Sequence, residues 1–264
     1  MGVVLDSINN TDKSEFFKKN GFIVEKDFLD KNYLLEMLEV MQKVFSIQIK
    51  ELYDGDSYEN IDEGMRALFH QDYRVFKNCG KQVQHLVDVW KLGVSHTLLT
   101  YLTKVCEMRF PNICTRPVVM FNNRSLATND VYHTVPFHQD AKSMDGSDNA
   151  VVVWIPLQQT NYDLGPLQVI PSSHKRGIIA DEIDDFGFGY VNPDLYDDDD
   201  ILSLSCSLGD VIFFDSKLIH GSGVNRSTYT RWSCQFRYND LLDTSFIKRG
   251  YPNPYLYKPV KENY

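Results

Sequence analysis

Three side chains that metal ions favour stand in two short segments of the chain. His138 and Asp140 belong to an H-Q-D triplet, and His220 opens an H-G-S-G segment. In a β-strand, residues two apart point to the same face, so His138 and Asp140 could both contact one ion. The triplet alone is more typical of an ordinary hydrogen-bonded histidine. Two histidines and one carboxylate together, with positions left open for oxygen and a co-substrate, form the facial triad that holds non-haem iron(II).

The segment 231–238 begins eleven residues after His220 and alternates polar with apolar side chains. Its polar face comprises Arg231, Ser233, Gln235 and Arg237, and its apolar face comprises Trp232, Cys234, Phe236 and Tyr238. We expect the apolar face to pack outward on helices and the polar face to line a barrel interior. A buried guanidinium needs an anionic partner, and its planar fork suits a carboxylate. Taken alone, Arg231 is more typical of a solvated strand face, where it would pair with a surface acid; the two metal-ligand segments favour the buried position.

The elements that must position these residues change in character near residue 110. Apolar residues recur at three- and four-residue intervals over 28–44, and a second helical stretch is expected over 83–102. Beyond residue 110, short segments rich in β-branched and aromatic residues are separated by turn formers, which is typical of a barrel or sandwich. We expect strands within 114–121, 150–157, 167–171, 210–215 and 231–238, a further strand bearing His220, and an extended tail over 241–264.

Composition excludes several classes of protein. The 264 residues carry 27 Lys+Arg against 36 Asp+Glu, a net charge of −9, so no duplex-binding surface is expected. No signal peptide or membrane-spanning run is recognised, and five cysteines without a C-x-x-C pair indicate reduced thiols. We therefore predict a cytoplasmic protein that acts on a small molecule, without nucleic-acid or membrane partners; the oligomeric state stays open.

The motifs occur in an order that resembles the phytanoyl-CoA dioxygenase family of Fe(II)/2-oxoglutarate-dependent oxygenases. The matching segments are H-Q-D at 138–140, A-V-V-V-W-I-P-L at 150–157, G-P-L-Q-V-I-P-S-S-H at 165–174, G-D-V-I-F-F at 209–214, H-G-S-G at 220–223 and R-W-S at 231–233, after F-F-K-K-N-G-F-I-V at 16–24. The resemblance covers roughly residues 16–240. It implies a mainly β fold with flanking helices: a double-stranded β-helix (jelly-roll or cupin-like) core over 111–240, an N-terminal helical layer over 1–110 and a C-terminal tail over 241–264.

The resemblance also implies roles for individual residues. His138, Asp140 and His220 would hold Fe(II), Arg231 would bind the distal carboxylate of 2-oxoglutarate with help from the Ser222 hydroxyl, and Trp154 would form a wall of the same pocket. The implied reaction consumes O2 and 2-oxoglutarate and releases succinate and CO2. Related halogenases replace the ligand carboxylate with a small residue, so the presence of Asp140 favours hydroxylation or a related oxidation.

The substrate is less well defined by the sequence. Polar residues near the H-Q-D segment and on the Arg231 face suggest a polar cavity for a small metabolite, with Asn122, Asn123, Tyr132, His133, Lys142, Ser143, Gln235 and Arg237 as candidate contacts. No basic cluster suited to the phosphates of coenzyme A is evident. Gly165 and Pro166 should form a tight turn before a strand, and His174 should be a structural hydrogen bonder rather than a ligand.

Two alternative functions share the predicted barrel. One is a catalytically silent cupin-like protein that only binds a metabolite, which predicts loss of one or more ligands. The other is a metal-dependent hydrolase or isomerase, which has little use for Arg231. The segment 181–200 carries nine acidic residues and no Lys or Arg, and so accounts for the whole charge excess. We expect a solvated loop inserted between barrel strands, with a mobile lid over the site as the alternative.

Overall fold

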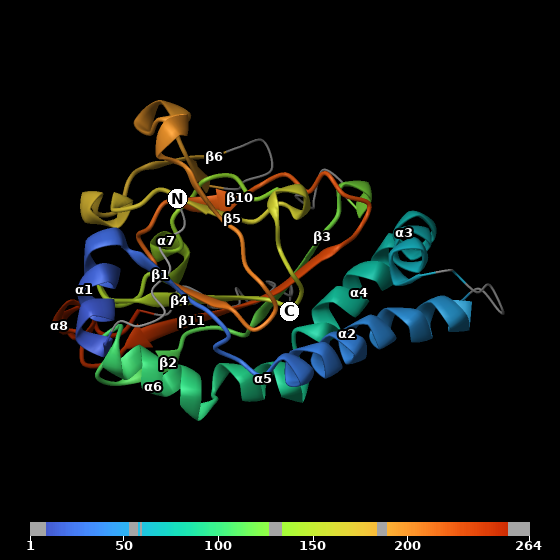
Figure 1. Cartoon of the computed structure of the whole chain (residues 1–264), viewed down its shortest axis with the longest axis horizontal. Helices are drawn as coiled ribbons and strands as arrows, with labels where there is room; N and C mark the ends of the chain where they lie inside the picture. Colours follow the sequence, from blue (N-terminus) through green and yellow to red (C-terminus); the bar gives the residue numbers. More distant parts are fainter. Residues whose placement is uncertain (1–8, 53–57, 59, 127–133, 184–188, 253–264) are drawn as a thin grey trace, which may run out of the picture.

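Two antiparallel sheets face each other, and a layer of helices covers the outer side of the larger one in the computed structural model (Figure 1). The structure describes residues 9–52, 58, 60–126, 134–183 and 189–252. Its strands are β1 Phe22–Glu25, β2 Pro111–Ile113, β3 Val118–Asn122, β4 Val151–Pro156, β5 Leu167–Val169, β6 Asp181–Ile183, β7 Gly189–Val191, β8 Leu202–Leu204, β9 Val211–Asp215, β10 His220–Ser222 and β11 Arg231–Asp240. Its α-helices are α1 Asn10–Asn20, α2 Lys31–Leu52, α3 Ile61–Gln71, α4 Tyr73–Val83, α5 Val87–Gly93, α6 His96–Lys104, α7 Ala141–Met144 and α8 Thr244–Lys248.

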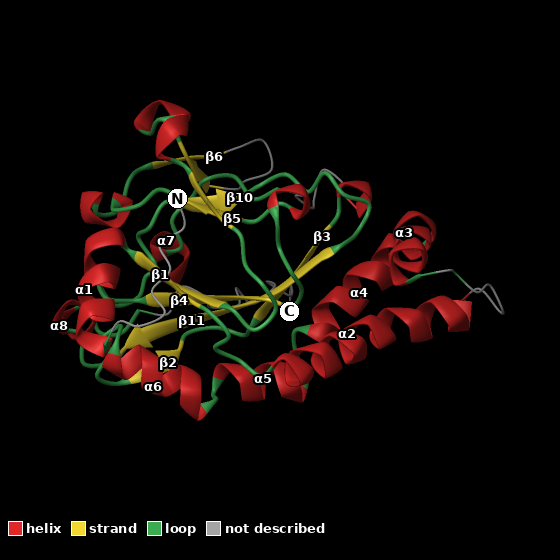
Figure 2. Ribbon diagram, viewed as in Figure 1, coloured by secondary structure: helices red, strands yellow, loops and turns green. Residues whose placement is uncertain are grey.

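The larger sheet has the strand order β1-β9-β4-β11-β2, with β3 also paired to β11, and the smaller sheet has the order β10-β5-β8. Neighbouring strands are far apart in sequence, as the crossed connections of a jelly roll require. Each strand predicted from the sequence is present at the expected place; most have shorter bounds than expected, whereas β11 extends to Asp240. The double-stranded β-helix fold with flanking helices is confirmed, and Figure 2 separates its strands from the surrounding helices.

The helical layer packs on the apolar face of β11. Trp232, Cys234, Phe236 and Tyr238 are buried in one core cluster with apolar residues of α2 to α6. Phe45 of α2, for example, lies edge-on to Trp232 with ring centroids 6.0 Å apart. The alternation predicted for β11 is therefore confirmed, and it turns the polar side chains of this strand toward the space between the sheets.

Among the differences from the sequence-based expectation, three concern the helices, β1 and the tail, and another is that the expected loop 181–200 contains the paired strands β6 and β7. The stretch 83–102 is two helices, because Ser95 accepts the N–H of Leu98 and starts α6 anew. β1 lies within the first 110 residues, yet it pairs with β9 of the larger sheet. The tail contains helix α8, capped by Asp243, whereas residues 253–264 lie outside the described part of the chain.

The five cysteines are free thiols, and four of them are buried. Burial raises the pKa of Cys114 and Cys206 to about 12, which leaves a thiolate fraction on the order of one in ten thousand at pH 8. We predict that the native protein reacts with a disulfide reagent such as DTNB at least ~100-fold more slowly than the protein unfolded in guanidinium chloride. A fast-reacting thiol in the native state would contradict this burial.

Candidate metal centre and anion pocket

His138 and His220 are placed opposite each other by their own backbones. The His138 N–H donates to the carbonyl of His220 at 2.8 Å, and the His220 N–H donates to the carbonyl of His138 at 3.0 Å. This isolated antiparallel bridge extends the smaller sheet beyond β10 and brings the imidazole centroids to 4.3 Å. Two segments far apart in sequence are thereby joined at the residues that could hold a metal.

The H-Q-D triplet is not the continuous strand that the sequence suggested. Strand pairing stops at His138, and Asp140 has helical backbone angles (φ −69°, ψ −22°) at the start of α7. The two side chains still converge, because the chain turns between them. Gln139 fixes this turn: it is buried, its amide NH2 donates to the carbonyls of Gly177 and Lys217, and its amide oxygen accepts the N–H of Ile179.

Both imidazoles present Nε2 to Asp140. Nδ1 of His138 lies 2.8 Å from the carbonyl of Pro136, and Nδ1 of His220 lies 2.9 Å from the carbonyl of Leu218, so each Nδ1 is the protonated donor. Each Nε2 lone pair is then free to bind a metal, as backbone partners commonly arrange for ligand histidines. Burial, reinforced by nearby His138, lowers the pKa of His220 to about 3, so its ring is neutral at pH 7.

Asp140 completes the cluster. Its Oδ1 lies 3.8 Å from Nε2 of His138, and its Oδ2 lies 3.8 Å from Nε2 of His220. Burial alone would raise the pKa of Asp140, but the Arg237 guanidinium and the two imidazoles outweigh burial and hold it below its usual range. Oδ2 is buried without a hydrogen-bond partner. One ligand atom of each residue lies within 4.8 Å of the others, and an orphaned carboxylate oxygen facing two imidazole lone pairs fits a divalent metal.

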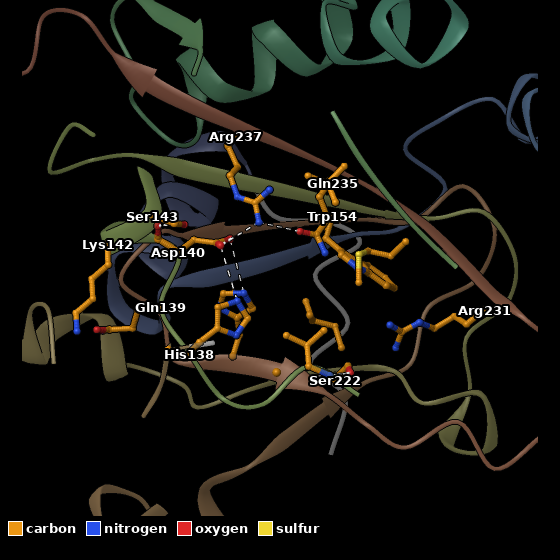
Figure 3. A pocket seen from close by; sticks show the side chains of 17 residues that line it. His138, Gln139, Asp140, Lys142, Ser143, Trp154, Ser222, Arg231, Gln235 and Arg237 are labelled. Carbon is orange, nitrogen blue, oxygen red and sulfur yellow. Dashed lines mark hydrogen bonds and ion pairs between the residues drawn. The ribbon is translucent and has the colours of Figure 1, made fainter. Parts of the chain in front are cut away.

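The triad lines a cavity of about 440 Å³ between the two sheets (Figure 3). The larger sheet contributes side chains from β3, β4 and β11, including Trp154, and the smaller sheet contributes residues of β5 and β10. Arg231 lies at the far end of the cavity from Arg237 in Figure 3, as expected for residues at opposite ends of one strand face.

Arg231 is 3% exposed. Its Nη2 donates to Oδ1 of Asn122 at 3.1 Å, its Nη1 donates to the carbonyl of Gly165, and its Nε has no hydrogen-bond partner. Burial lowers its pKa to about 10, so it remains a cation at pH 7. Within the described residues it forms no ion pair with a carboxylate. A buried cation held by two neutral acceptors is incompletely neutralised, which fits an anionic ligand.

Ser222 stands between the triad and Arg231 on the cavity wall. Its Oγ accepts the N–H of Val135 at 2.7 Å, and its hydroxyl proton remains available for an acceptor in the cavity. Trp154 is almost completely buried and lines the same cavity from β4. Ser222 and Trp154 therefore line the same cavity as the triad and Arg231.

The candidate substrate contacts fall into three groups. Lys142, Ser143, Gln235 and Arg237 line the cavity. Asn122 and Asn123 do not: Asn122 orients Arg231, and Asn123 donates to the carbonyl of Thr228. Tyr132 and His133 lie outside the described residues. The cavity also has apolar walls, formed by Val118, Met120, Val135, Trp154 and Leu167, so it is less polar than the sequence suggested.

Two motif residues have structural contacts. Gly165 adopts φ +71° before β5, and a Cβ there would lie 2.4 Å from the carbonyl oxygen of Gly223, so the G-P turn requires glycine. Nε2 of His174 lies 3.0 Å from the carbonyl of Lys18, outside the triad. The contact between the Gly165 carbonyl and Arg231 could not be predicted from the sequence, because every residue type has a backbone carbonyl.

The acidic insertion contacts the cavity through its β7 strand. Gly189 lines the cavity, and the N–H of Val191 donates to the carbonyl of Phe137 at 2.7 Å, beside the triad. The acidic residues Asp197–Asp200 are exposed. We predict that replacing these four aspartates with asparagine changes kcat and KM by less than about twofold, because solvent screens exposed charges. A larger change in KM would instead indicate that the charges steer the substrate.

Comparison with known protein families and sequences identifies relatives of this chain. The family model for phytanoyl-CoA dioxygenase (PhyH) matches residues 17–233. Phytanoyl-CoA dioxygenase of Arabidopsis thaliana is 23% identical over 240 residues, covering 83% of this chain and 85% of that protein. The peroxisomal phytanoyl-CoA dioxygenase of Bos taurus is 24% identical over 256 residues, covering 91% and 73%.

Solved structures share the fold at low identity. The non-heme monooxygenase ThoJ has a TM-score of 0.62 at 15% identity, over 87% of this chain and 77% of its own. The epimerase SnoN, solved with Fe3+ and alpha ketoglutarate, has a TM-score of 0.60 at 14% identity, over 88% and 83%. The family match and the His-Asp-His cluster together identify the protein as a non-haem iron, 2-oxoglutarate-dependent dioxygenase. The match over 17–233 shows that the chain belongs to the phytanoyl-CoA dioxygenase family.

Proposed function

We propose that the protein hydroxylates a small metabolite that carries both polar and apolar groups, with 2-oxoglutarate and O2 as co-substrates. The observation that carries this proposal is a single cavity lined at one end by three metal-ligating side chains and at the other by an incompletely neutralised arginine. A co-substrate with a metal-chelating end and a distal carboxylate would satisfy both ends at once.

His138, Asp140 and His220 would hold iron(II), which when bound supplies the activation of O2 that is coupled to conversion of 2-oxoglutarate into succinate and CO2. Arg231 would bind the distal carboxylate through its planar fork, and the Ser222 hydroxyl would donate to the same group. Trp154 and Leu167 would exclude water from the methylene carbons. The remaining contribution of the chain is to hold one C–H bond of the substrate beside the metal.

Size and charge of the cavity limit the substrate. A volume of about 440 Å³, shared with 2-oxoglutarate, leaves room for a small metabolite beside it. Lys142, Ser143, Gln235 and Arg237 offer polar contacts around the triad, and Val118 and Met120 offer apolar ones. This mixture of polar and apolar contacts, in a cavity of this size, supports a small, partly polar substrate rather than a long acyl thioester. The presence of Asp140 as a ligand supports hydroxylation rather than halogenation.

Anaerobic titration of the protein with Fe(II) and 2-oxoglutarate tests the proposal. We expect the visible charge-transfer band of a chelated complex, followed in air by succinate formation that one member of a substrate panel accelerates. The panel should include amino acids, nucleosides, sugars, phosphonates and acyl thioesters. Absence of the band would refute the oxygenase assignment and favour a silent binding protein or a hydrolase, whereas stimulation by acyl thioesters alone would refute the proposed substrate class.

The location of the protein in the cell is also a proposal. No described helix is long and apolar enough to cross a membrane. The Bos taurus and Homo sapiens relatives are named as peroxisomal, whereas we propose the cytoplasm for this chain. Fractionation of cells that make the full chain would decide between the two compartments.

A further inference from the structure

The two oxygens of Asp140 have different surroundings. Oδ1 accepts a hydrogen bond from Nη2 of Arg237 at 3.0 Å (Figure 3). Oδ2 is buried, has no hydrogen-bond partner and lies 3.8 Å from Nε2 of His220. Oδ1 also lies 3.8 Å from Nε2 of His138, so each oxygen faces one imidazole, but Oδ1 is hydrogen-bonded to a cation whereas Oδ2 accepts no hydrogen bond.

Arg237 is well placed to impose this asymmetry. Its backbone lies inside β11, where it is paired with Val152 of β4, and its carbonyl accepts the N–H of Cys114. Its Nη2 also donates to the amide oxygen of Gln235 at 3.2 Å, from the same face of the strand. Asp140, by contrast, stands on a turn before a four-residue helix. Nη2 of Arg237 is thus held between two acceptors, and its hydrogen bond to Oδ1 limits rotation of the Asp140 carboxylate.

We propose that Arg237 is a positioning residue that keeps Asp140 to one ligating oxygen, Oδ2. This inference rests on the proposed function. A facial triad occupies three positions of an octahedron, and a chelating 2-oxoglutarate takes two more, so one position remains. If Oδ1 were released from Arg237, both carboxylate oxygens could bind the metal and fill that position. Arg237 would therefore reserve the site at which oxygen reacts without touching any reacting atom.

The test uses three variants of the full chain. Arg237→Met removes the charge at similar volume, Arg237→Lys keeps it with different geometry, and Gln235→Leu removes one partner of the guanidinium. Arg226→Met is the matched control, because the Arg226 side chain is exposed, stacks on Tyr162 and does not line the cavity of the triad. Thermal unfolding of each variant establishes that it is folded before it is compared.

The first measurement is the crystal structure of the Co(II)-loaded protein without 2-oxoglutarate. We expect one Asp140 oxygen on the metal in the wild type and in Arg226→Met, and two in Arg237→Met. One oxygen in Arg237→Met would overturn the proposal. This measurement depends only on the metal, so it stands even where the wild type shows no charge-transfer band with Fe(II) and 2-oxoglutarate, which is the result that refutes the proposed function itself.

The second measurement is nitric oxide binding to the anaerobic Fe(II)·2-oxoglutarate complex, followed by electron paramagnetic resonance. We expect NO affinity to fall by ~10- to 100-fold in Arg237→Met, an effect as large as the one that removal of a residue orienting a metal ligand has on metal affinity or activity. A smaller loss is expected in Arg237→Lys and in Gln235→Leu, with the charge-transfer band retained in each. Unchanged NO affinity in Arg237→Met would contradict the proposed role. Gln235→Leu gives the same test where Arg237→Met fails to fold.

Discussion

Asp140→Asn is expected to lower Fe(II) affinity by more than about 100-fold, and turnover with it. Loss of a residue that only orients a ligand costs ~10- to 100-fold, so loss of the anionic ligand itself should cost more. Asparagine keeps the size of the side chain and an oxygen that can accept from Arg237, which limits the structural damage. Calorimetric titration with Fe(II) or Co(II) measures the affinity, and succinate formation measures the turnover.

His96→Gln is the matched control for this substitution, because His96 is exposed on α6, away from the cavity. It should bind metal and turn over like the wild type. Asp140→Ala is a less suitable variant, since it leaves the Arg237 guanidinium without this carboxylate, and breaking a buried ion pair costs roughly 3–5 kcal/mol. Wild-type metal affinity in Asp140→Asn would show that the triad is not the metal site.

Arg231→Met is expected to weaken 2-oxoglutarate binding by ~30-fold to several thousand-fold, because truncating one partner of a buried, hydrogen-bonded charge pair costs roughly 2–5 kcal/mol. Metal affinity should be nearly unchanged, since Arg231 contacts no member of the triad. The variant should also unfold at an equal or higher temperature than the wild type in the absence of 2-oxoglutarate, because a buried and incompletely neutralised charge is replaced by an apolar side chain.

Thermal unfolding with and without 2-oxoglutarate, in the presence of a non-reactive metal such as Co(II), separates these effects. The wild type should gain stability as the co-substrate concentration rises above its Kd, whereas Arg231→Met should gain almost none. Arg231→Lys should recover little, since a point charge does not reproduce a planar fork. Loss of metal binding in Arg231→Met would show that the arginine supports the triad rather than the co-substrate.

Much of the site could be predicted from the sequence because its chemistry resides in residue types. Few other residue types could take the roles proposed for His138, Asp140, His220 and Arg231, and the alternation of β11 indicated which way Arg231 points. The change of periodicity near residue 110 and the turn formers between short strands indicated a helical part followed by a barrel or sandwich, and the family resemblance implied the double-stranded β-helix. These signals are local, so a single sequence contains them.

The rest depends on contacts between distant segments. Gln139 looks like a neutral spacer within H-Q-D, yet its amide fixes the turn between two ligands by contacts with Gly177, Lys217 and Ile179. Asn122 was predicted to face the substrate because it is polar, but its oxygen accepts from Arg231. Nothing in the spacing of 140 and 237 indicates that the two side chains meet, since Arg237 lies on the larger sheet and Asp140 follows a bridge to the smaller one, and only the packing of the two sheets brings them to 3.0 Å.

The mutual backbone pairing of His138 and His220 has a consequence for how the protein acquires its metal. Both imidazoles are held by backbone hydrogen bonds, and Oδ1 of Asp140 accepts from Arg237, so contacts within the protein hold the three side chains in place. Binding then requires little further ordering of the chain, in contrast to zinc fingers, which fold only with their metal. A chelator should therefore remove the metal without unfolding the protein. The rate at which the metal binds again should be limited by diffusion into the barrel rather than by refolding. Such a protein could exchange its iron repeatedly through its lifetime.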